Sequence, residues 1–450
     1  MKKTIRFACI SLALTLLLLC FASCSSQGKA LITMSKDGTK VSFSVNHYEL
    51  LLSRWKGNLV SGNYSNNGYN AEQDGFYDLK DRFNGEKLQT LGEYYADLIL
   101  ENCKNFTAVL WLFESQGLSL TDKQLQEIDQ RLSDALDYYG EGSKTKLNSI
   151  LANYGVNYSM LKEIYRLEAM VDAVQTALYG TEGSLLGYEV KEQFLNENYV
   201  HFKQIFLPYF HYVYKTDANG DEIYYVKESQ MATVCYDTSA FAGKDDKGLP
   251  ITDSNGDQIY YTSEDFTRIA YDKVNGVRSY VLDKNGEATT KEMTADEIKA
   301  VKERGEALLA TLKDCTVAEF EAAMLKENTD FGEDSYPDGY YLQKNIDYAG
   351  AGSDFAYFTD IINAMDAMES GDIVSITSDA AGYHIVMKYT PTPKAYENDI
   401  NKVWFQNFIS ALVDELFMDE CQALYSYMTV NTEILATAAD IKRIGVNLYF

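Results

Sequence analysis

The spacing of the apolar residues changes along this 450-residue chain, and the change predicts a protein built from several parts. Residues 30–46 alternate between apolar and polar side chains, which is typical of β-strands. From about residue 45 to residue 200 the apolar residues recur at helical spacing. Residues 211–292 are β-like again, and helical spacing returns at residue 294. Separate blocks of the two periods predict an α+β fold, and the length predicts two or three domains.

A ten-residue segment is repeated within the β-like block. Thr216–Tyr225 recurs as Thr252–Tyr261, and Leu282–Glu287 is a weaker echo. Each copy contains Asn-Gly, the strongest short hairpin signal, because both residues tolerate positive φ. The Asp-x-Asn-Gly-Asp spacing is also compatible with the start of a calcium loop, but the later ligands, including a glutamate at the twelfth position, are not in register. Hairpin turns are therefore predicted, with calcium binding as the second interpretation.

The last part of the chain is predicted to be mainly helical. Two helices are expected at residues 294–312 and 317–326. A long helix is expected from Lys394 to Val430, because Pro391 and Pro393 disfavour helical conformation in the residues before them.

The N-terminus has the composition of an export signal. Basic residues at its start precede the apolar run Phe7–Phe21, which is the length of a signal-peptide core. Ala22-Ser23-Cys24 resembles a bacterial lipobox, in which the cysteine receives lipid and becomes the new N-terminus. This predicts a signal peptide at residues 1–23 and a lipid anchor on Cys24, at the extracytoplasmic face of the cell membrane. An ordinary signal peptide cut near Ser23 is the alternative.

Composition excludes several classes of protein. The formal net charge of −26 argues against a nucleic-acid binder, which needs a basic surface. Beyond Cys24, the cysteines are widely spaced and the chain has four histidines, so neither a zinc site nor a disulfide scaffold is indicated. Buried free thiols are favoured over one long-range disulfide. No nucleophile elbow, phosphate loop or dinucleotide motif is found, and no cofactor or metal is expected.

Three separated pieces of the chain belong together when read in order. The first is Tyr199–Leu207, the second is Ala307–Asp334 followed by Gly339–Tyr341, and the third is Met368–Ser375 with Ala381–Lys388. Together they resemble one domain of the parvulin family of peptidyl-prolyl isomerases. The third piece contains Gly-Tyr-His-Ile-Val-Met-Lys, which resembles the final strand of the family and is the most specific of the matches. The resemblance implies a parvulin-like domain at residues 199–393, interrupted at about 211–295 by the hairpin-rich insertion.

The arrangement around this domain resembles the PrsA and, more distantly, SurA foldases. In these families helices on both sides of the isomerase domain join into a chaperone module. Here residues 24–198 and 394–450 would take that part.

The resemblance also implies site residues. Parvulins place a histidine on the first strand, a cysteine or aspartate after the second helix, and a histidine on the last strand. By position these correspond to Gln204, Asp330 and His384, so the first position departs from the family, as does Ala381 where a serine is frequent. His201 is three residues before Gln204, which places it on the opposite face of a strand. Each of these residues also has a purely structural interpretation. His384 would then be a histidine of the core, and Asp330 would be an ordinary turn residue.

A proline pocket is expected in the helical segment before the last two strands. Its candidate residues are Phe355, Phe358, Ile361, Ile362 and Met365. Helical spacing also places some of these side chains in the core.

Three functions are compatible with these observations. The resemblance implies a lipid-anchored foldase that isomerises X-Pro bonds in unfolded or partly folded exported polypeptides. The departures at Gln204 and Ala381 favour a second hypothesis, a holdase that keeps the fold without strong catalysis. The third is a solute- or glycan-binding lipoprotein that uses the tyrosine-rich insertion.

Overall fold

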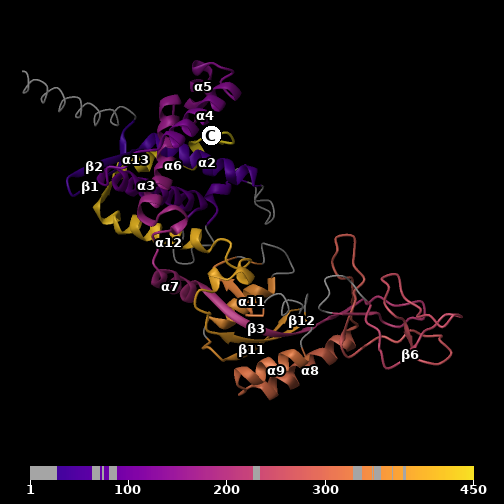
Figure 1. Cartoon of the computed structure of the whole chain (residues 1–450). Coiled ribbons are helices and arrows are strands. Elements are labelled where there is room, and N and C mark those ends of the chain that lie inside the picture. Colours follow the sequence, from indigo (N-terminus) through magenta and orange to yellow (C-terminus); the bar gives the residue numbers. More distant parts are fainter. Residues whose placement is uncertain are drawn as a thin grey trace, which may run out of the picture. The chain divides into compact units, whose positions relative to one another are not determined.

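The computed structural model shows a mixed helical and sheet protein (Figure 1). It describes residues 28–62, 71–72, 75–80, 89–226, 234–327, 337–346, 348, 356–366, 368–378 and 382–450. Two compact units are present. The first contains the described residues up to Lys191 together with Asn407–Phe450, and the second is Glu192–Gln406. Among the described residues, no helix is both long and apolar enough to cross a membrane.

The first unit packs helices against a small antiparallel sheet of order β13-β1-β2. Its strands are β1 (Ala30–Lys36), β2 (Thr39–Ser44) and β13 (Met428–Val430). Its helices are α2 (Val45–Ser61), α3 (Leu91–Ser115), α4 (Asp122–Tyr138), α5 (Lys144–Leu151), α6 (Tyr158–Tyr179), α12 (Phe408–Ala423) and α13 (Thr432–Ala438). A further helix, α7 (Tyr188–Asn198), contains the boundary between the units.

Local sequence signals explain how this unit begins. Asp37 and Gly38 both have positive φ, 50° and 83°, which is the geometry of a two-residue hairpin turn between β1 and β2. Ser44 then caps α2 by accepting a hydrogen bond from the His47 backbone amide at 3.2 Å. The strands and the helix expected from residue 30 onward are therefore confirmed.

The long helix predicted from Lys394 to Val430 is wrong at both ends. Residues 395–397 and 399–401 form 3-10 turns, the helix α12 starts at Phe408, and β13 replaces its last turn. The Asn398 side chain accepts a hydrogen bond from the Ile400 amide, which competes with helix formation. At the other end, β13 pairs with β1, with Val430 opposite Ile32, so the sheet satisfies its backbone groups.

The second unit is built on a four-stranded antiparallel sheet of order β10-β3-β12-β11. The strands are β3 (Tyr199–Pro208), β10 (Tyr340–Gln343), β11 (Ile373–Ser378) and β12 (Gly382–Tyr389). The helices α8 (Ala295–Leu312) and α9 (Val317–Glu327) cover one face, and α11 (Ala356–Met365) covers the other (Figure 1). Each face has its own hydrophobic core.

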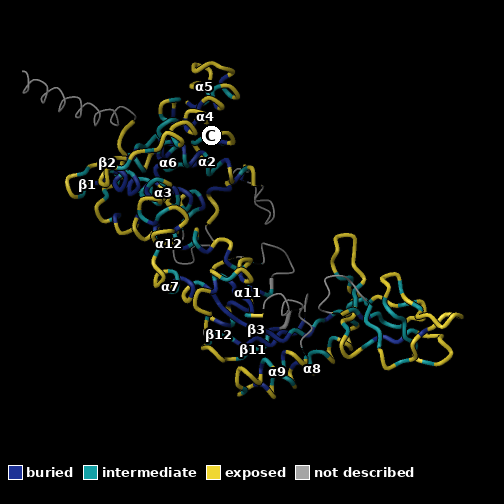
Figure 2. The backbone as a smooth tube through the Cα atoms, viewed as in Figure 1, coloured by how far each residue is buried: buried dark blue, intermediate teal, exposed yellow. Residues whose placement is uncertain are grey.

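The chain between β3 and α8 folds into one nested β-ribbon. Its strands are β4 (Phe210–Tyr212), β5 (Tyr224–Val226), β6 (Phe241–Ala242), β7 (Tyr260–Tyr261), β8 (Gly276–Arg278) and β9 (Thr290–Glu292). They pair as β4 with β9, β5 with β8 and β6 with β7. Figure 2 shows that the sheet strands are buried, whereas most of the ribbon is half-buried or exposed.

Side turns project from this ribbon at the repeated segments. In the first of them the Asp217 carboxylate accepts hydrogen bonds from the amides of Asn219 and Asp221, and Gly220 has a φ of 85°. Asn219 is not in the positive-φ region, so these turns have one left-handed residue rather than the two predicted from Asn-Gly. This is a type I turn closed by a glycine bulge. The same hydrogen bonds occur around Asp253 and Asp283, and among the described residues no group of acidic, histidine or cysteine side chains is arranged to hold a metal.

Candidate functional site

Two of the predicted site residues, Gln204 and His384, lie side by side on the sheet. In the register of β3 and β12, Val386 is opposite Gln204 and Phe206 is opposite His384. Gln204 and His384 are therefore diagonal neighbours on one face, close enough for their side chains to interact. His384 Nδ1 lies 2.9 Å from Gln204 Oε1. Both side chains are buried, with exposures of 1% for His384 and 3% for Gln204.

The His384 ring is held between two aromatic rings. Phe206, from β3, stacks on the imidazole with ring centroids 4.7 Å apart and planes 25° apart. Tyr357, from the first turn of α11, stacks on it at 4.6 Å and 17°. Elements of the sheet and of the helix above it thus fix the plane of the imidazole.

Burial sets the protonation state of this histidine. Desolvation lowers the pKa of His384 to about 4, so the ring is neutral at pH 7. Since Gln204 Oε1 can only accept a hydrogen bond, the proton of the neutral ring lies on Nδ1. His384 Nε2 is then a bare acceptor, and it is buried with no hydrogen-bond partner among the described residues. An unpaired buried acceptor costs about 1–3 kcal/mol, so this atom is a candidate for a role in binding or chemistry.

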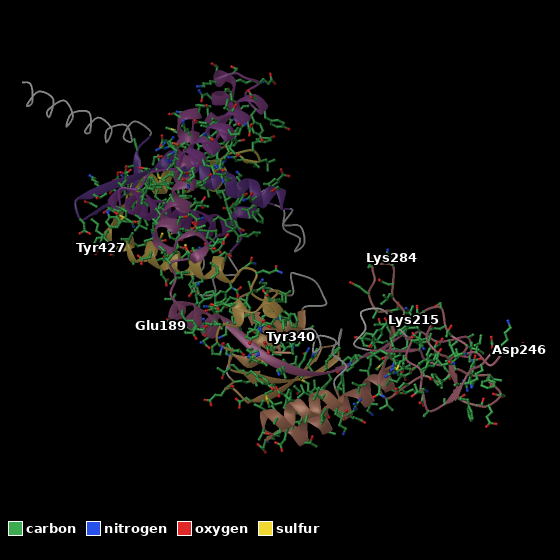
Figure 3. All side chains as sticks on the ribbon, in the orientation of Figure 1. Glu189, Lys215, Asp246, Lys284, Tyr340 and Tyr427 are labelled. Carbon is green, nitrogen blue, oxygen red and sulfur yellow. The ribbon has the colours of Figure 1, made fainter. Side chains whose placement is uncertain are left out.

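The other predicted site residues are divided between the core and the segments that the structure does not describe. Asp330, Phe355 and Cys24 lie outside the described residues, as does Ala381. The remaining pocket candidates, Phe358, Ile361, Ile362 and Met365, are buried in the core between α11 and the sheet. Figure 3 labels Tyr340, a residue of β10 in the same core. Contact between a substrate and these side chains stays a prediction.

The structure places His201 on the opposite face of β3, as its odd spacing from Gln204 predicts. It lies opposite Tyr341 of β10 and Tyr389 of β12 and stacks on Tyr341 with ring centroids 4.1 Å apart. Its Nε2 is 2.6 Å from the carbonyl oxygen of Asp338, and its Nδ1 is 2.9 Å from that of Thr390. These contacts make His201 part of the packing between β3 and its two neighbouring strands, away from the Gln204–His384 pair.

Sequence reasoning missed the two rings that sandwich the imidazole. Phe206 could have been found, because it is two residues after Gln204 on a predicted strand and so shares its face. Tyr357 gives no such signal. Its contact with His384 depends on how the first turn of α11 is placed over β12.

Comparison with known proteins gives structural neighbours and no sequence match. No protein-family model matches the chain, and no curated protein matches it. Among solved structures, it is similar to the foldase protein PrsA from Streptococcus pneumoniae, at 13% identity over 76% of this chain and 89% of that chain, with a TM-score of 0.20. It is also similar to PrsA from Bacillus subtilis, at 13% identity over 75% of this chain and 88% of that chain, with a TM-score of 0.18. TM-scores of this size do not establish a common fold.

Proposed function

We propose that this chain is an extracytoplasmic, lipid-anchored foldase, and that Glu192–Gln406 is its parvulin-like domain, which isomerises X-Pro bonds in exported polypeptides. The order of elements supports the proposal. Apart from the ribbon strands β4–β9, the first strand (β3) is followed by two helices (α8 and α9), a strand and a helix (β10 and α11), and the last two strands (β11 and β12). The strands that correspond to the first and last of the family are neighbours in the sheet.

The single observation that carries the proposal is the buried pair of Gln204 and His384. A buried polar atom normally has a hydrogen-bond partner. His201, on the other face of the same sheet, has a carbonyl oxygen within reach of each nitrogen, so its N–H finds an acceptor in either neutral tautomer. His384 instead uses Nδ1 on Gln204 and leaves Nε2 without a partner among the described residues.

The chemistry of isomerisation fits such a site. Rotation about an X-Pro bond faces a barrier of about 20 kcal/mol, because resonance holds the amide planar. A catalyst needs no covalent step, and lowering this barrier by about 5–6 kcal/mol accelerates the rotation ~10⁴-fold. The twisted amide has lost its resonance dipole, so a dry, aromatic enclosure favours it over the planar form. Placed polar groups add to this preference.

The residues of the pair have distinct roles in this proposal. Gln204 accepts the Nδ1 proton and so fixes the tautomer and the plane of the ring. His384 presents Nε2 as an acceptor to an N–H of the bound polypeptide, inside a water-poor site. Tyr357 covers one face of the imidazole, and the proline ring takes its place there during binding.

The holdase hypothesis remains the second candidate, and the burial of the site favours it. His384 is 1% exposed and Tyr357 covers one face of its ring, so a polypeptide stacks on that face only when Tyr357 moves. If Tyr357 does not move, the protein would bind exposed segments of its client polypeptides at other surfaces and would not catalyse X-Pro isomerisation.

NMR exchange spectroscopy on a short Ala-Pro peptide separates the two candidates. The chain from residue 25 is expected to accelerate cis–trans exchange, and His384→Phe, which keeps a ring between Phe206 and Tyr357, is expected to reduce the acceleration at least tenfold. The matched control is His201→Phe, a buried histidine on the other face of β3, which is expected to keep the activity if the protein is folded by circular dichroism. Absence of any acceleration, together with suppression of client aggregation in light scattering, would establish the holdase.

A further inference from the structure

A cavity of about 280 Å³ lies where the nested ribbon joins the sheet domain. The ribbon and Met293 beside it contribute six of the ten lining residues, and β3 and α8 contribute two each. The lining residues are Leu207, Pro208, Phe210, His211, Tyr212, Tyr214, Arg278, Met293, Val301 and Arg304. The cavity therefore exists only because the ribbon is inserted at this point of the chain.

A series of ring contacts, the first stacked and the others tilted or edge-to-face, connects His384 to this cavity. Phe206, which covers one face of the imidazole, has its ring centroid 6.3 Å from that of Phe210 in the cavity wall. Phe210 contacts Tyr212 at 5.0 Å. Tyr280 continues the series, 5.1 Å from Tyr212 and 5.1 Å from Tyr214. Phe210 thus belongs both to this series and to the cavity wall, and it links the Phe206 ring beside His384 with the cavity.

The far end of the series is a flat platform. The Arg278 guanidinium lies 4.2 Å from the centroid of the Tyr214 ring, and its NH1 is 3.5 Å from Glu222 Oε2. This pairing holds the guanidinium over the ring. A guanidinium fixed in this way is a good surface for stacking another aromatic ring.

The charges around the cavity argue against an acidic ligand. Each basic side chain in the lining already has a carboxylate partner. Arg278 is paired with Glu222, Arg304 with Glu327, and His211 with Glu297 at 3.1 Å. An anion would have to displace one of these carboxylates, whereas an uncharged ring can stack on the platform without doing so.

We propose that this cavity is a specificity pocket for an aromatic side chain of the bound polypeptide, a few residues from its proline. The inference rests on the proposed function, because it assumes that the polypeptide is bound at His384. The volume suits one large side chain rather than a separate small molecule. The walls are rings and apolar groups, and the platform of Tyr214 and Arg278 faces an aromatic guest. The insertion, in this proposal, adds sequence preference to a general X-Pro site.

The test compares two peptides that differ at one position. Both peptides contain Ala-Pro, and one has a tryptophan where the other has an alanine. The comparison is repeated with this position moved in turn to each of four positions on either side of the proline. Binding to the chain from residue 25 is measured by isothermal titration. We expect at least tenfold tighter binding for one tryptophan position. Val301→Phe, which fills the cavity from α8, is expected to abolish this difference, and the control Leu325→Phe, at an exposed site on α9, is expected to keep it.

A second variant tests the pocket in case the Val301→Phe protein does not fold. Arg278 is about half exposed and belongs to neither core of the sheet domain, so Arg278→Met is expected to fold and to reduce the tryptophan preference three- to tenfold. Equal binding of all peptides, no measurable binding, or a preference that survives both cavity variants would overturn the proposal. Failure of isomerisation alone would not, because binding is measured separately. A cavity-dependent preference without isomerisation would reject the proposed catalysis and leave the aromatic pocket standing.

Discussion

At the scale of single residues, the proposed function depends on His384. Its imidazole is buried, neutral and held by one hydrogen bond and two stacked rings. Burial lowers the pKa of His384 to about 4 from its ordinary 6.5. As the pH falls, His384 is therefore protonated in the unfolded chain at a higher pH than in the folded chain. The contribution of His384 to the free energy of unfolding is complete above pH 6.5 and is lost as the pH falls toward 4.

This difference in pKa predicts an acid-sensitive fold. Between pH 7 and pH 5, His384 is expected to contribute a loss of about 2 kcal/mol in the free energy of unfolding. The measurement is urea unfolding of the unmodified chain and of His384→Phe at both pH values. The variant should lose about 2 kcal/mol less than the unmodified chain. The comparison cancels the other buried histidines, His47 and His201, whose pKa values burial also lowers. Equal losses in the two proteins would show that the imidazole is not desolvated in solution.

The sequence predicts only part of this environment. The Gly-Tyr-His segment and the period of a strand are enough to place His384 and Gln204 on strands, and to place His201 on the opposite face from Gln204. That these two strands are neighbours comes from the structure. The stacking of Tyr357 cannot be read in this way, because it depends on the path of the chain between α11 and β12. The candidate residues Asp330 and Phe355 lie outside the described residues, so their roles stay predictions.

At the scale of elements, the contact of α8 with β12 depends on a glycine. Gly305 is buried in the middle of α8, and a Cβ atom at this position would lie 2.5 Å from Cδ1 of Tyr383. Tyr383 is a neighbour of His384 in β12 and belongs to the core on the α8 face. The absence of a side chain at Gly305 thus lets the helix approach the strand that holds the candidate site.

Replacement of this glycine should therefore destabilise the domain. Glycine-to-alanine changes in exposed helix interiors normally stabilise by about 1 kcal/mol. For Gly305→Ala we expect the opposite sign, a loss of about 1–3 kcal/mol, because the methyl group overpacks against the Tyr383 ring. Chemical denaturation measures the change, with the exposed neighbour Glu306→Ala as the control, expected within about 0.5 kcal/mol of the unmodified chain. A stabilised Gly305→Ala would mean that α8 does not pack closely on β12.

Elements with strong local signals were predicted well, and elements decided by distant pairing were not. The β1–β2 hairpin and the helix that follows it are determined by an Asp-Gly turn and a serine cap, both local features. The segment after Lys394 has helical spacing, but its asparagines form local hydrogen bonds and Phe405 packs against Tyr341 of the sheet. The strand β13 forms because β1, nearly four hundred residues earlier, offers it a partner.

At the scale of the whole molecule, the chain forms one unit from its two ends and a second unit from its middle. Residues 407–450 supply part of the core of the first unit. Their buried members are Phe417, Cys421, Leu424, Ala438 and Ile441. The second unit has separate cores on both faces of its sheet.

This division predicts unequal effects of truncation. Deletion of residues 407–450 is expected to unfold the first unit, because β1 loses β13 and α3 loses contact with α12. The second unit should keep its fold. Hydrogen exchange monitored by mass spectrometry should show lost protection in β1 and α3 and retained protection in β3 and β12. A control deletion of residues 448–450 leaves α12, β13 and α13 intact. Both units are expected to keep their protection from hydrogen exchange in this variant. Retained protection of α3 after the long deletion would contradict the division.

The proposed function requires that a proline-containing polypeptide binds at the His384 imidazole. The most direct test is ¹⁵N NMR of the histidine side chains during titration with an Ala-Pro peptide, which is practical because the chain contains four histidines. His384→Phe identifies the resonances. We predict that Nδ1 of His384 is protonated. We also predict that its Nε2 resonance shifts with a saturable dependence on peptide concentration, while the resonances of His201 stay in place. An Nε2 resonance that does not move when the peptide is bound would contradict the claim.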